Sequence, residues 1–226
     1  MPRKPRCIEP GVPYHVTQRG VDRTKVFLSR ADRLTYLGLF EKNLEDTGVS
    51  VLSYCLMTNH IHAIVVPHRE DSLAVLFRRV HGRFAQFMNT RRFRNGHLWQ
   101  NRFYSCPLAR THLWTALRYV EWNPVRAGMV QVPEQYEWST ASAHLEGPTK
   151  KTEFLDWNLW RQLGGSEGWR EAFGATQDAI QEAHLRRSTH SGRPFGDESF
   201  IHHFEERFGR YWLPQGRPKS SVVVSA

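Results

Sequence analysis

Residues 49–66 read VSVLSYCLMTNHIHAIVV, and this stretch decides the fold. Two runs rich in β-branched and aromatic residues, 49–57 and 61–66, are separated by Thr58 and Asn59. Threonine and asparagine at such a junction favour a turn, so the stretch predicts a β-hairpin.

The hairpin lies inside an alternation of predicted strands and helices. Hydrophobic spacing and chain breakers predict a strand at 14–19, a helix at 30–46 capped by Ser29, the two hairpin strands, a helix that carries Leu73 to Phe87, a strand at 98–108 and a helix at 110–122. The order β-α-β-β-α-β, followed by a helix, indicates an α+β fold. We expect the ferredoxin-like split βαβ core, an antiparallel sheet with helices on one face.

The remainder of the chain is predicted to be a helical extension. We divide the chain into a ferredoxin-like catalytic domain at 1–145 and a C-terminal extension at 146–226 with a basic tail. An amphipathic helix is expected at 197–208, before Gly209. The extension is either a small helical nucleic-acid-binding module or a helical lid on the main domain.

The charge of the chain points to a polyanionic partner. Its 226 residues contain 31 Lys and Arg against 22 Asp and Glu, a formal charge of +9. Such an excess most often indicates nucleic acid, and a merely basic surface is the alternative. No apolar run reaches the ~18 residues of a membrane span, and the N-terminus lacks the apolar core of a signal peptide. We therefore expect a cytoplasmic protein without membrane contact.

The cysteine content gives no sign of disulfide bonds or of a zinc site. Cys7, Cys55 and Cys106 are an odd number and have no C-x-x-C spacing. The sequence therefore favours neither a disulfide framework nor a thiolate zinc site.

Two histidines on the second hairpin strand form a candidate metal site. Residues two apart on a strand point to one face, so His60 and His62 should project together while Ile61 enters the other side. Two convergent imidazoles can chelate a metal ion. Alternatively, the pair simply lies on a polar face of the sheet.

The helix at 110–122 carries a second candidate site. Tyr119 and Asn123 are four residues apart, so a helix places the phenol and the amide on the same face. The alternative is that Tyr119 packs in the core and that Asn123 caps the helix before Pro124.

The segment Trp99-Gln100-Asn101-Arg102-Phe103-Tyr104 interleaves aromatic rings with hydrogen-bonding and cationic groups. Single-stranded nucleic acid is held in this way, by stacking on aromatic rings and by charge on the phosphates. Core aromatics on an amphipathic strand are the competing explanation.

Three motifs together resemble a known family. MTNHIH at 57–62, LWQNRF at 98–103 and YVEWNPVRAG at 119–128 closely resemble the REP-associated tyrosine transposases, which belong to the single-tyrosine transposases with a His-hydrophobic-His motif. The resemblance covers about residues 8–145 in the same order and spacing. Gly192-Arg193-Pro194 also resembles the C-terminal extension of some members. One departure is Thr58, where relatives usually carry proline.

The resemblance implies an enzyme that cuts single-stranded DNA beside hairpins and can rejoin the ends. Tyr119 would be the nucleophile and would carry the 5′-phosphate, and His60, His62 and Asn123 would hold a divalent metal ion. Two imidazoles and an amide are softer than the donors magnesium prefers, so Mn²⁺ should suit the site at least as well as Mg²⁺. The expected nucleic-acid contacts are Arg19, Trp99, Gln100, Arg102, Arg126 and Arg193.

The partner, the oligomeric state and the function each have an expected answer and an alternative. The partner is expected to be single-stranded DNA with REP-like hairpins at the nucleoid, and the protein a monomer, with a homodimer as the alternative. A DNA-binding protein without catalysis, acting at a hairpin or operator, is the alternative function. A hydrolase of small phosphoesters is less favoured, because a small substrate does not need a charge of +9.

Overall fold

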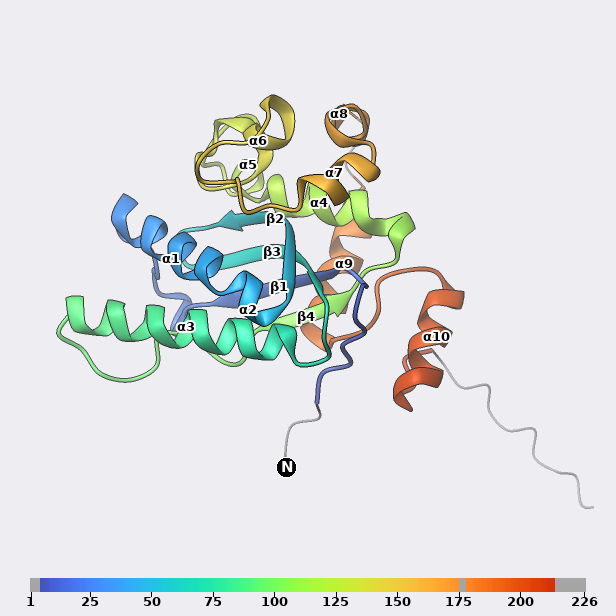
Figure 1. Ribbon diagram of the computed structural model, residues 1–226, viewed down its shortest axis with the longest axis horizontal. Coiled ribbons are helices and arrows are strands. Elements are labelled where there is room, and N and C mark those ends of the chain that lie inside the picture. The colour runs from blue at the N-terminus through green and yellow to red at the C-terminus, as the bar shows by residue number, and fades with distance from the viewer. Residues whose placement is uncertain (1–4, 175–177, 214–226) are drawn as a thin grey trace, which may run out of the picture.

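The computed structural model describes residues 5–174 and 178–213, and its centre is a four-stranded sheet (Figure 1). The strands are β1 (Tyr14–Arg19), β2 (Val49–Leu56), β3 (His60–Pro67) and β4 (Tyr104–Pro107). Their order is β2-β3-β1-β4, and every neighbouring pair is antiparallel. This order, with a helix between β1 and β2 and another between β3 and β4, confirms the α+β, ferredoxin-like fold.

Helices cover both faces of the sheet, whereas helices on one face only were expected; helices later in the chain cover the second face. The helices and 3-10 turns are η1 (Val21–Arg23), α1 (Arg30–Lys42), α2 (Leu44–Thr47), α3 (Ser72–Arg91), η2 (Arg110–His112), α4 (Leu113–Glu121), α5 (Asn123–Arg126), η3 (Pro133–Gln135), α6 (Ala141–Glu146), α7 (Trp157–Gln162), α8 (Gly165–Gly174), α9 (Ala179–Ser191) and α10 (Glu198–Phe208). One face carries α1 and α3, which contact each other, and the other carries α4 and α9. Helix α10 lies beyond the β4 side of the sheet (Figure 1).

Strand alternation assigns side chains to these two faces. Ile61 of β3 lines a small cavity together with Tyr36 and Phe40 of α1. The ring of its neighbour His62 lies instead against Tyr119 of α4. The rings of His60 and His62 are 4.9 Å apart, so the prediction that both project from one face is confirmed.

The first helix is shorter than its hydrophobic spacing predicts. A capping box formed by Ser29 and Asp32 starts α1, as expected for that cap. The helix ends at Lys42 rather than at 46, and the short helix α2 follows. The amide of Asn43 donates to the Leu39 carbonyl, a side-chain bond that competes with regular helix bonds. Gly48 then ends α2 with a positive φ.

The predicted strand at 98–108 is wrong over its first half. Only Tyr104–Pro107 pairs regularly with β1, and Trp99 forms one isolated bridge with Gly20. The Trp99 ring packs 4.6 Å from the His81 ring, and its N–H donates to the His81 carbonyl. Two backbone bonds, from Gln100 N–H to the Arg19 carbonyl at 2.9 Å and from Val21 N–H to the Leu98 carbonyl at 3.0 Å, continue the pairing before it stops.

The two later helices agree better with their predicted ends. Helix α4 ends at Glu121, before Asn123-Pro124, and Pro124 lies in the first turn of α5. Helix α10 starts after Asp197, whose side chain caps it, and ends at Gly209 with a positive φ.

Segments late in the chain close both edges of the sheet. At β2, the Leu56 amide donates to the Trp138 carbonyl, and the Asp156 amide donates to the Val51 carbonyl, each at 2.8 Å. At β4, the Phe195 amide donates to the Pro107 carbonyl at 2.9 Å. Parts of the C-terminal extension are thus hydrogen-bonded to the core sheet.

The division of the chain at residue 145 stays a prediction, and the basic tail expected near the C-terminus falls within 214–226, outside the described residues. None of the helices within 5–174 and 178–213 is both long and apolar enough to span a bilayer.

Candidate active site

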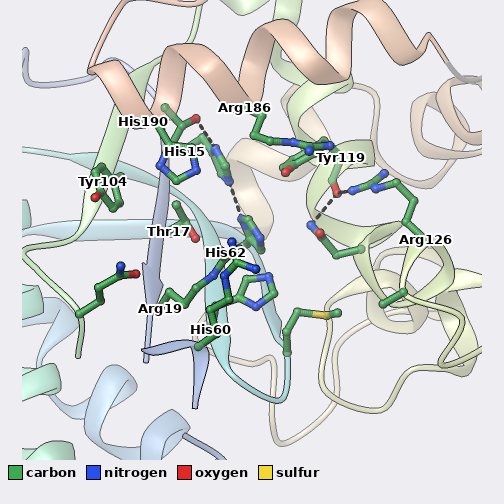
Figure 2. A pocket seen from close by; sticks show the side chains of 16 residues that line it. His15, Thr17, Arg19, His60, His62, Tyr104, Tyr119, Arg126, Arg186 and His190 are labelled. Atoms are coloured by element: carbon green, nitrogen blue, oxygen red, sulfur yellow. Dashed lines mark hydrogen bonds between the residues drawn. The ribbon is translucent and has the colours of Figure 1, made fainter. Parts of the chain in front are cut away.

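A pocket of about 600 Å³ opens on the face of the sheet that α4 and α9 cover (Figure 2). Strands β1 and β3 form its floor, and α4, α5 and α9 contribute its walls. Its lining residues are His15, Thr17, Arg19, Arg23, Met57, His60, His62, Gln100, Tyr104, Tyr119, Asn123, Arg126, Ala127, Arg186, Thr189 and His190. The structure therefore brings Tyr119, His60, His62 and Asn123 to one cavity.

The two candidate ligand histidines are held by their Nδ1 atoms. His60 Nδ1 lies 2.6 Å from Asn59 Oδ1, and His62 Nδ1 lies 2.8 Å from His15 Nε2. Within the described ranges, neither Nε2 atom has a hydrogen-bond partner. Each ring therefore keeps one nitrogen for a ligand.

Both rings are neutral at pH 7. Burial, and then the charge of Arg19, lower the pKa of His60 to about 4. Burial, followed by the neighbouring His60 and His15 rings and by arginines, lowers the pKa of His62 well below its ordinary value. Only a neutral imidazole has the lone pair that binds a metal ion.

Tyr119 is buried, yet its ring lies at the pocket and not among aliphatic side chains. Its ring meets those of His15 and His62 edge to face, with centroids 5.6 Å apart in each case. The Arg126 guanidinium carbon lies 4.5 Å from the centroid of the phenol ring. Figure 2 shows Tyr119 between these histidines and the arginines Arg126 and Arg186.

Asn123 caps α4 with its amide nitrogen and lies at the pocket. Its Nδ2 donates to the carbonyls of Tyr119 at 2.9 Å and Val120 at 3.3 Å, so the amide does cap the end of α4. Because the nitrogen is used in this way, the Oδ1 atom is left as an acceptor at the pocket. Its amide oxygen is the group that could bind a cation.

These donors fit a weakly held divalent cation. No Asp or Glu lines the pocket, and the described residues contain no group of three or more His, Cys, Asp or Glu side chains suited to a metal ion. A metal site here needs the amide of Asn123 beside the imidazoles of His60 and His62. Two imidazoles and one amide oxygen suit Mn²⁺, and also Mg²⁺ that keeps several waters, and leave positions open for substrate oxygens.

The pocket is strongly electropositive. Arg19, Arg23, Arg126 and Arg186 line it without any lining carboxylate. Arg126 is oriented from outside the lining, because its Nη1 lies 3.0 Å from Glu182 Oε1 on α9, and it also donates to the Tyr119 carbonyl. Guanidinium groups with free donors are well suited to phosphate oxygens.

The expected nucleic-acid contacts fall into three groups. Arg19, Gln100 and Arg126 line the pocket. Trp99 does not line it, because its ring packs against His81, which favours the alternative explanation of a core aromatic. Trp99 also lines another cavity with Arg102 and Phe103, and its role as a DNA contact stays a prediction.

Two further arginines lie outside the pocket. Arg102 is exposed and lines a neighbouring cavity of about 460 Å³, next to Phe103. Arg193 is half-buried just after the end of α9. Their roles as DNA contacts stay predictions.

Sequence reasoning missed the contribution of α9. Glu182, Arg186 and Thr189 are spaced i, i+4 and i+7, which places them on one face of a helix. That spacing of polar residues was the available signal. His15 was also missed, although it alternates with Thr17 on β1 and so shares its face.

Comparison with known proteins identifies the family to which the chain belongs. The sequence profile described as "Transposase IS200 like" matches residues 10–123. The chain belongs to this transposase family. The match runs from just before β1 to Asn123, so it contains every residue expected to act in catalysis, and it ends before α9.

One curated relative and one solved structure of REP-associated tyrosine transposases agree with the resemblance expected from the three motifs. A curated protein of Haemophilus influenzae, described as a REP-associated tyrosine transposase, is 24% identical over 131 residues, which are 53% of this chain and 73% of that protein. A solved REP-associated tyrosine transposase bound to a REP hairpin is 18% identical with a TM-score of 0.56, covering 67% of this chain and 90% of that one. A solved transposase from Deinococcus radiodurans is 13% identical with a TM-score of 0.38, covering 53% of this chain and 96% of that one.

Proposed function

We propose that this IS200-like transposase is a metal-dependent endonuclease and strand transferase for single-stranded DNA, acting beside REP-like hairpins through a covalent 5′-phosphotyrosine intermediate. The observation that carries the proposal is the pocket in which the Tyr119 ring lies against the His62 imidazole, under Arg126. A phenol, two neutral imidazoles and arginines in a pocket without a lining carboxylate suit the transfer of a phosphodiester to tyrosine.

Tyr119 is the proposed nucleophile. Its Oη would attack the phosphorus, forming the O–P bond while the bond from phosphorus to the 3′-oxygen breaks. The phenol proton passes to water, and the released 3′-oxygen takes a proton from water. Because one phosphodiester replaces another, the reverse step can join the 5′-phosphate to a different 3′-hydroxyl, which is strand transfer.

His60, His62 and Asn123 are the residues proposed to hold Mg²⁺ or Mn²⁺. When bound, such an ion polarises a phosphoryl oxygen and offsets the charge that develops there. The chain itself contributes orientation and charge. Arg126 and Arg186 would bind the remaining phosphate oxygens, and the buried position of Tyr119 would hold its ring in place for attack.

Hairpin DNA is the proposed partner because a related solved transposase is described as bound to a REP hairpin. The charge of +9 and the arginine-lined pocket support a polyanionic substrate. We further propose that the protein acts as a monomer at the nucleoid in the cytoplasm. Light scattering after gel filtration tests the monomer, and a stable dimer would contradict it.

The decisive experiment traps the covalent intermediate. Purified protein is mixed with labelled single-stranded hairpin oligonucleotides and Mn²⁺ or Mg²⁺, and the products are run on a denaturing gel. The wild type should give a metal-dependent band of protein joined to DNA, and Tyr119→Phe should give none. Tyr104→Phe is the matched control, since it removes a phenol from the same pocket and should still form the adduct.

The outcomes separate the proposed functions. An adduct that needs Tyr119 and metal supports the nucleophile, the covalent step and the substrate class together. Tight binding of hairpin DNA by a wild type that never forms an adduct would reject catalysis and favour the DNA-binding protein without catalysis.

A further inference from the structure

A line of hydrogen bonds connects His62 with helix α9. Thr189 Oγ1 on α9 lies 2.7 Å from His15 Nδ1, and His15 Nε2 lies 2.8 Å from His62 Nδ1. All three side chains are buried. Figure 2 draws these bonds as dashed lines on either side of His15. The side chains thus lie in series from α9 across β1 to β3.

The contact of Thr189 with Leu185 determines where the hydroxyl hydrogen of Thr189 points. Thr189 Oγ1 lies 2.9 Å from the carbonyl oxygen of Leu185, and a carbonyl can only accept a hydrogen bond. The single hydroxyl hydrogen of Thr189 is therefore used there. The lone pairs of the hydroxyl remain for its two other neighbours, Cys106 Sγ at 3.2 Å, whose thiol can donate, and His15 Nδ1, so His15 Nδ1 carries a hydrogen and donates it.

The state of His15 then fixes the state of His62. The His15 ring is buried beside a pocket that no carboxylate lines, where a cationic imidazole would be strongly disfavoured. A neutral ring with its hydrogen on Nδ1 has a bare Nε2, which must accept from His62 Nδ1. The lone pair of a neutral His62 is consequently on Nε2, the nitrogen free to bind a metal ion.

We infer that helix α9 determines which nitrogen of His62 is open to a metal ion, with Thr189 and His15 as positioning residues. The inference rests on the proposed function, in which His62 is a ligand. Hydrogen bonds of this kind orient ligand histidines and select their tautomer. Since α9 lies outside the residues that match the family, part of the C-terminal extension belongs to the catalytic centre rather than to a separate module.

His60 provides an internal reference, because its tautomer is fixed locally. The amide nitrogen of Asn59 donates to the Arg23 carbonyl at 3.0 Å, so Asn59 presents its oxygen to His60 Nδ1. His60 should therefore also carry its hydrogen on Nδ1. Its chain of hydrogen bonds contains no residue of α9, so a change in α9 should not affect it.

The test measures histidine tautomers by nitrogen NMR on metal-free protein labelled with ¹⁵N-histidine. Signals are assigned with His60→Asn and His62→Asn variants. In the wild type, both rings should carry the hydrogen on Nδ1. Thr189→Val keeps the shape of the side chain but removes its hydroxyl. We expect it to abolish the single tautomer of His62, leave His60 unchanged and weaken Mn²⁺ binding in calorimetry by roughly 10–100-fold. Thr189→Ser should restore both properties.

Thr47→Val is the matched control for loss of a buried hydroxyl. Thr47 is fully buried in α2, and its hydroxyl donates to the Asn43 carbonyl at 2.6 Å, away from the pocket. This variant should leave the His62 tautomer and the Mn²⁺ affinity unchanged. Equal effects of the Thr47 and Thr189 variants would indicate a general loss of stability and overturn the inference.

Two other results would overturn it. One is a wild-type His62 with its hydrogen on Nε2, a measurement that needs no variant to fold. The other is Thr189→Val with both tautomer and affinity unchanged. If Thr189→Val shifts the tautomer and weakens Mn²⁺ binding while the wild type forms no DNA adduct, the inference stands and the proposed catalysis fails.

Discussion

Glu121 on α4 is expected to be a major source of stability beneath the pocket. Its carboxylate is fully buried and accepts hydrogen bonds from Ser53 at 3.0 Å, Thr140 at 2.5 Å and the Trp169 indole at 2.8 Å. His144 Nδ1 lies 2.6 Å from the same carboxylate. These contacts fix α4 against β2, α6 and α8, and α4 carries Tyr119.

Replacing Glu121 with leucine preserves the volume approximately but removes every acceptor. The hydroxyls of Ser53 and Thr140 lie 2.8 Å apart and can bond to each other, whereas the Trp169 indole N–H loses its acceptor. A buried donor without an acceptor costs ~1–3 kcal/mol. For a chain of this size the lower figure corresponds to a fall in Tm of about 2 °C or more.

The assay is urea unfolding followed by far-ultraviolet circular dichroism, arranged as a double-mutant cycle with Trp169→Phe. Phenylalanine removes the stranded indole N–H, so Trp169→Phe should cost less in the Glu121→Leu background than in the wild type. Glu137→Leu is the control. Glu137 has two cationic partners, Arg30 and Lys151, but it is exposed and should contribute under about 1 kcal/mol. Additive effects in the cycle, or a Glu121→Leu cost no larger than the control, would refute this account.

Three further predictions follow from described contacts. Burial alone would raise the pKa of Glu121, but the adjacent His144 and the hydrogen bonds lower this pKa below 4.5. The stabilisation by Glu121 should be complete above that pH and be lost as the pH falls through the pKa of the folded protein. Tm should therefore drop more steeply in acid for the wild type than for Glu121→Leu. Trp99→Phe should lower Tm, because it loses the hydrogen bond to the His81 carbonyl, worth ~1 kcal/mol. The Kd for hairpin DNA, measured by fluorescence anisotropy, should stay unchanged. Weaker DNA binding at unchanged Tm would instead support a stacking role for Trp99. Binding of hairpin DNA should weaken steeply with salt, and Arg186→Gln should reduce the slope of log K against log salt by about 1 if that guanidinium binds a phosphate; an unchanged slope would remove Arg186 from the DNA contacts.

Elements with strong local signals could be predicted from the sequence. The hairpin follows from two β-rich runs around a short turn, and α1 starts where Ser29 predicts its cap. The segment at 98–103 could not be predicted in this way, because the same alternation of aromatic and polar residues suits a DNA-binding strand and a buried edge. What decides between them is the contact of Trp99 with His81 of α3, which no local pattern contains.

In the candidate site too, contacts within one element could be predicted and contacts between elements could not. His60 and His62 share a strand, and Tyr119 and Asn123 share a helical face, so spacing within one element brings each pair together. Joining the two pairs required the family resemblance. The hydrogen bond between His15 and Thr189 joins residues 174 positions apart. One partner is an ordinary strand histidine and the other an ordinary helix threonine, so the sequence around neither residue predicts this bond.

The closed edges of the sheet set an order of events during synthesis. Residues leave the ribosome from the N-terminus, so the four strands can pair once Pro107 has emerged. The outer edge of β2 then waits for Trp138 and Asp156, and that of β4 waits for Phe195. An open strand edge is a template for another chain. Nascent chains shorter than about residue 195 are therefore expected to associate with one another, which light scattering of chains truncated at 145 would reveal. Late segments of the chain would thus protect the early ones while polysomes hold many copies close together.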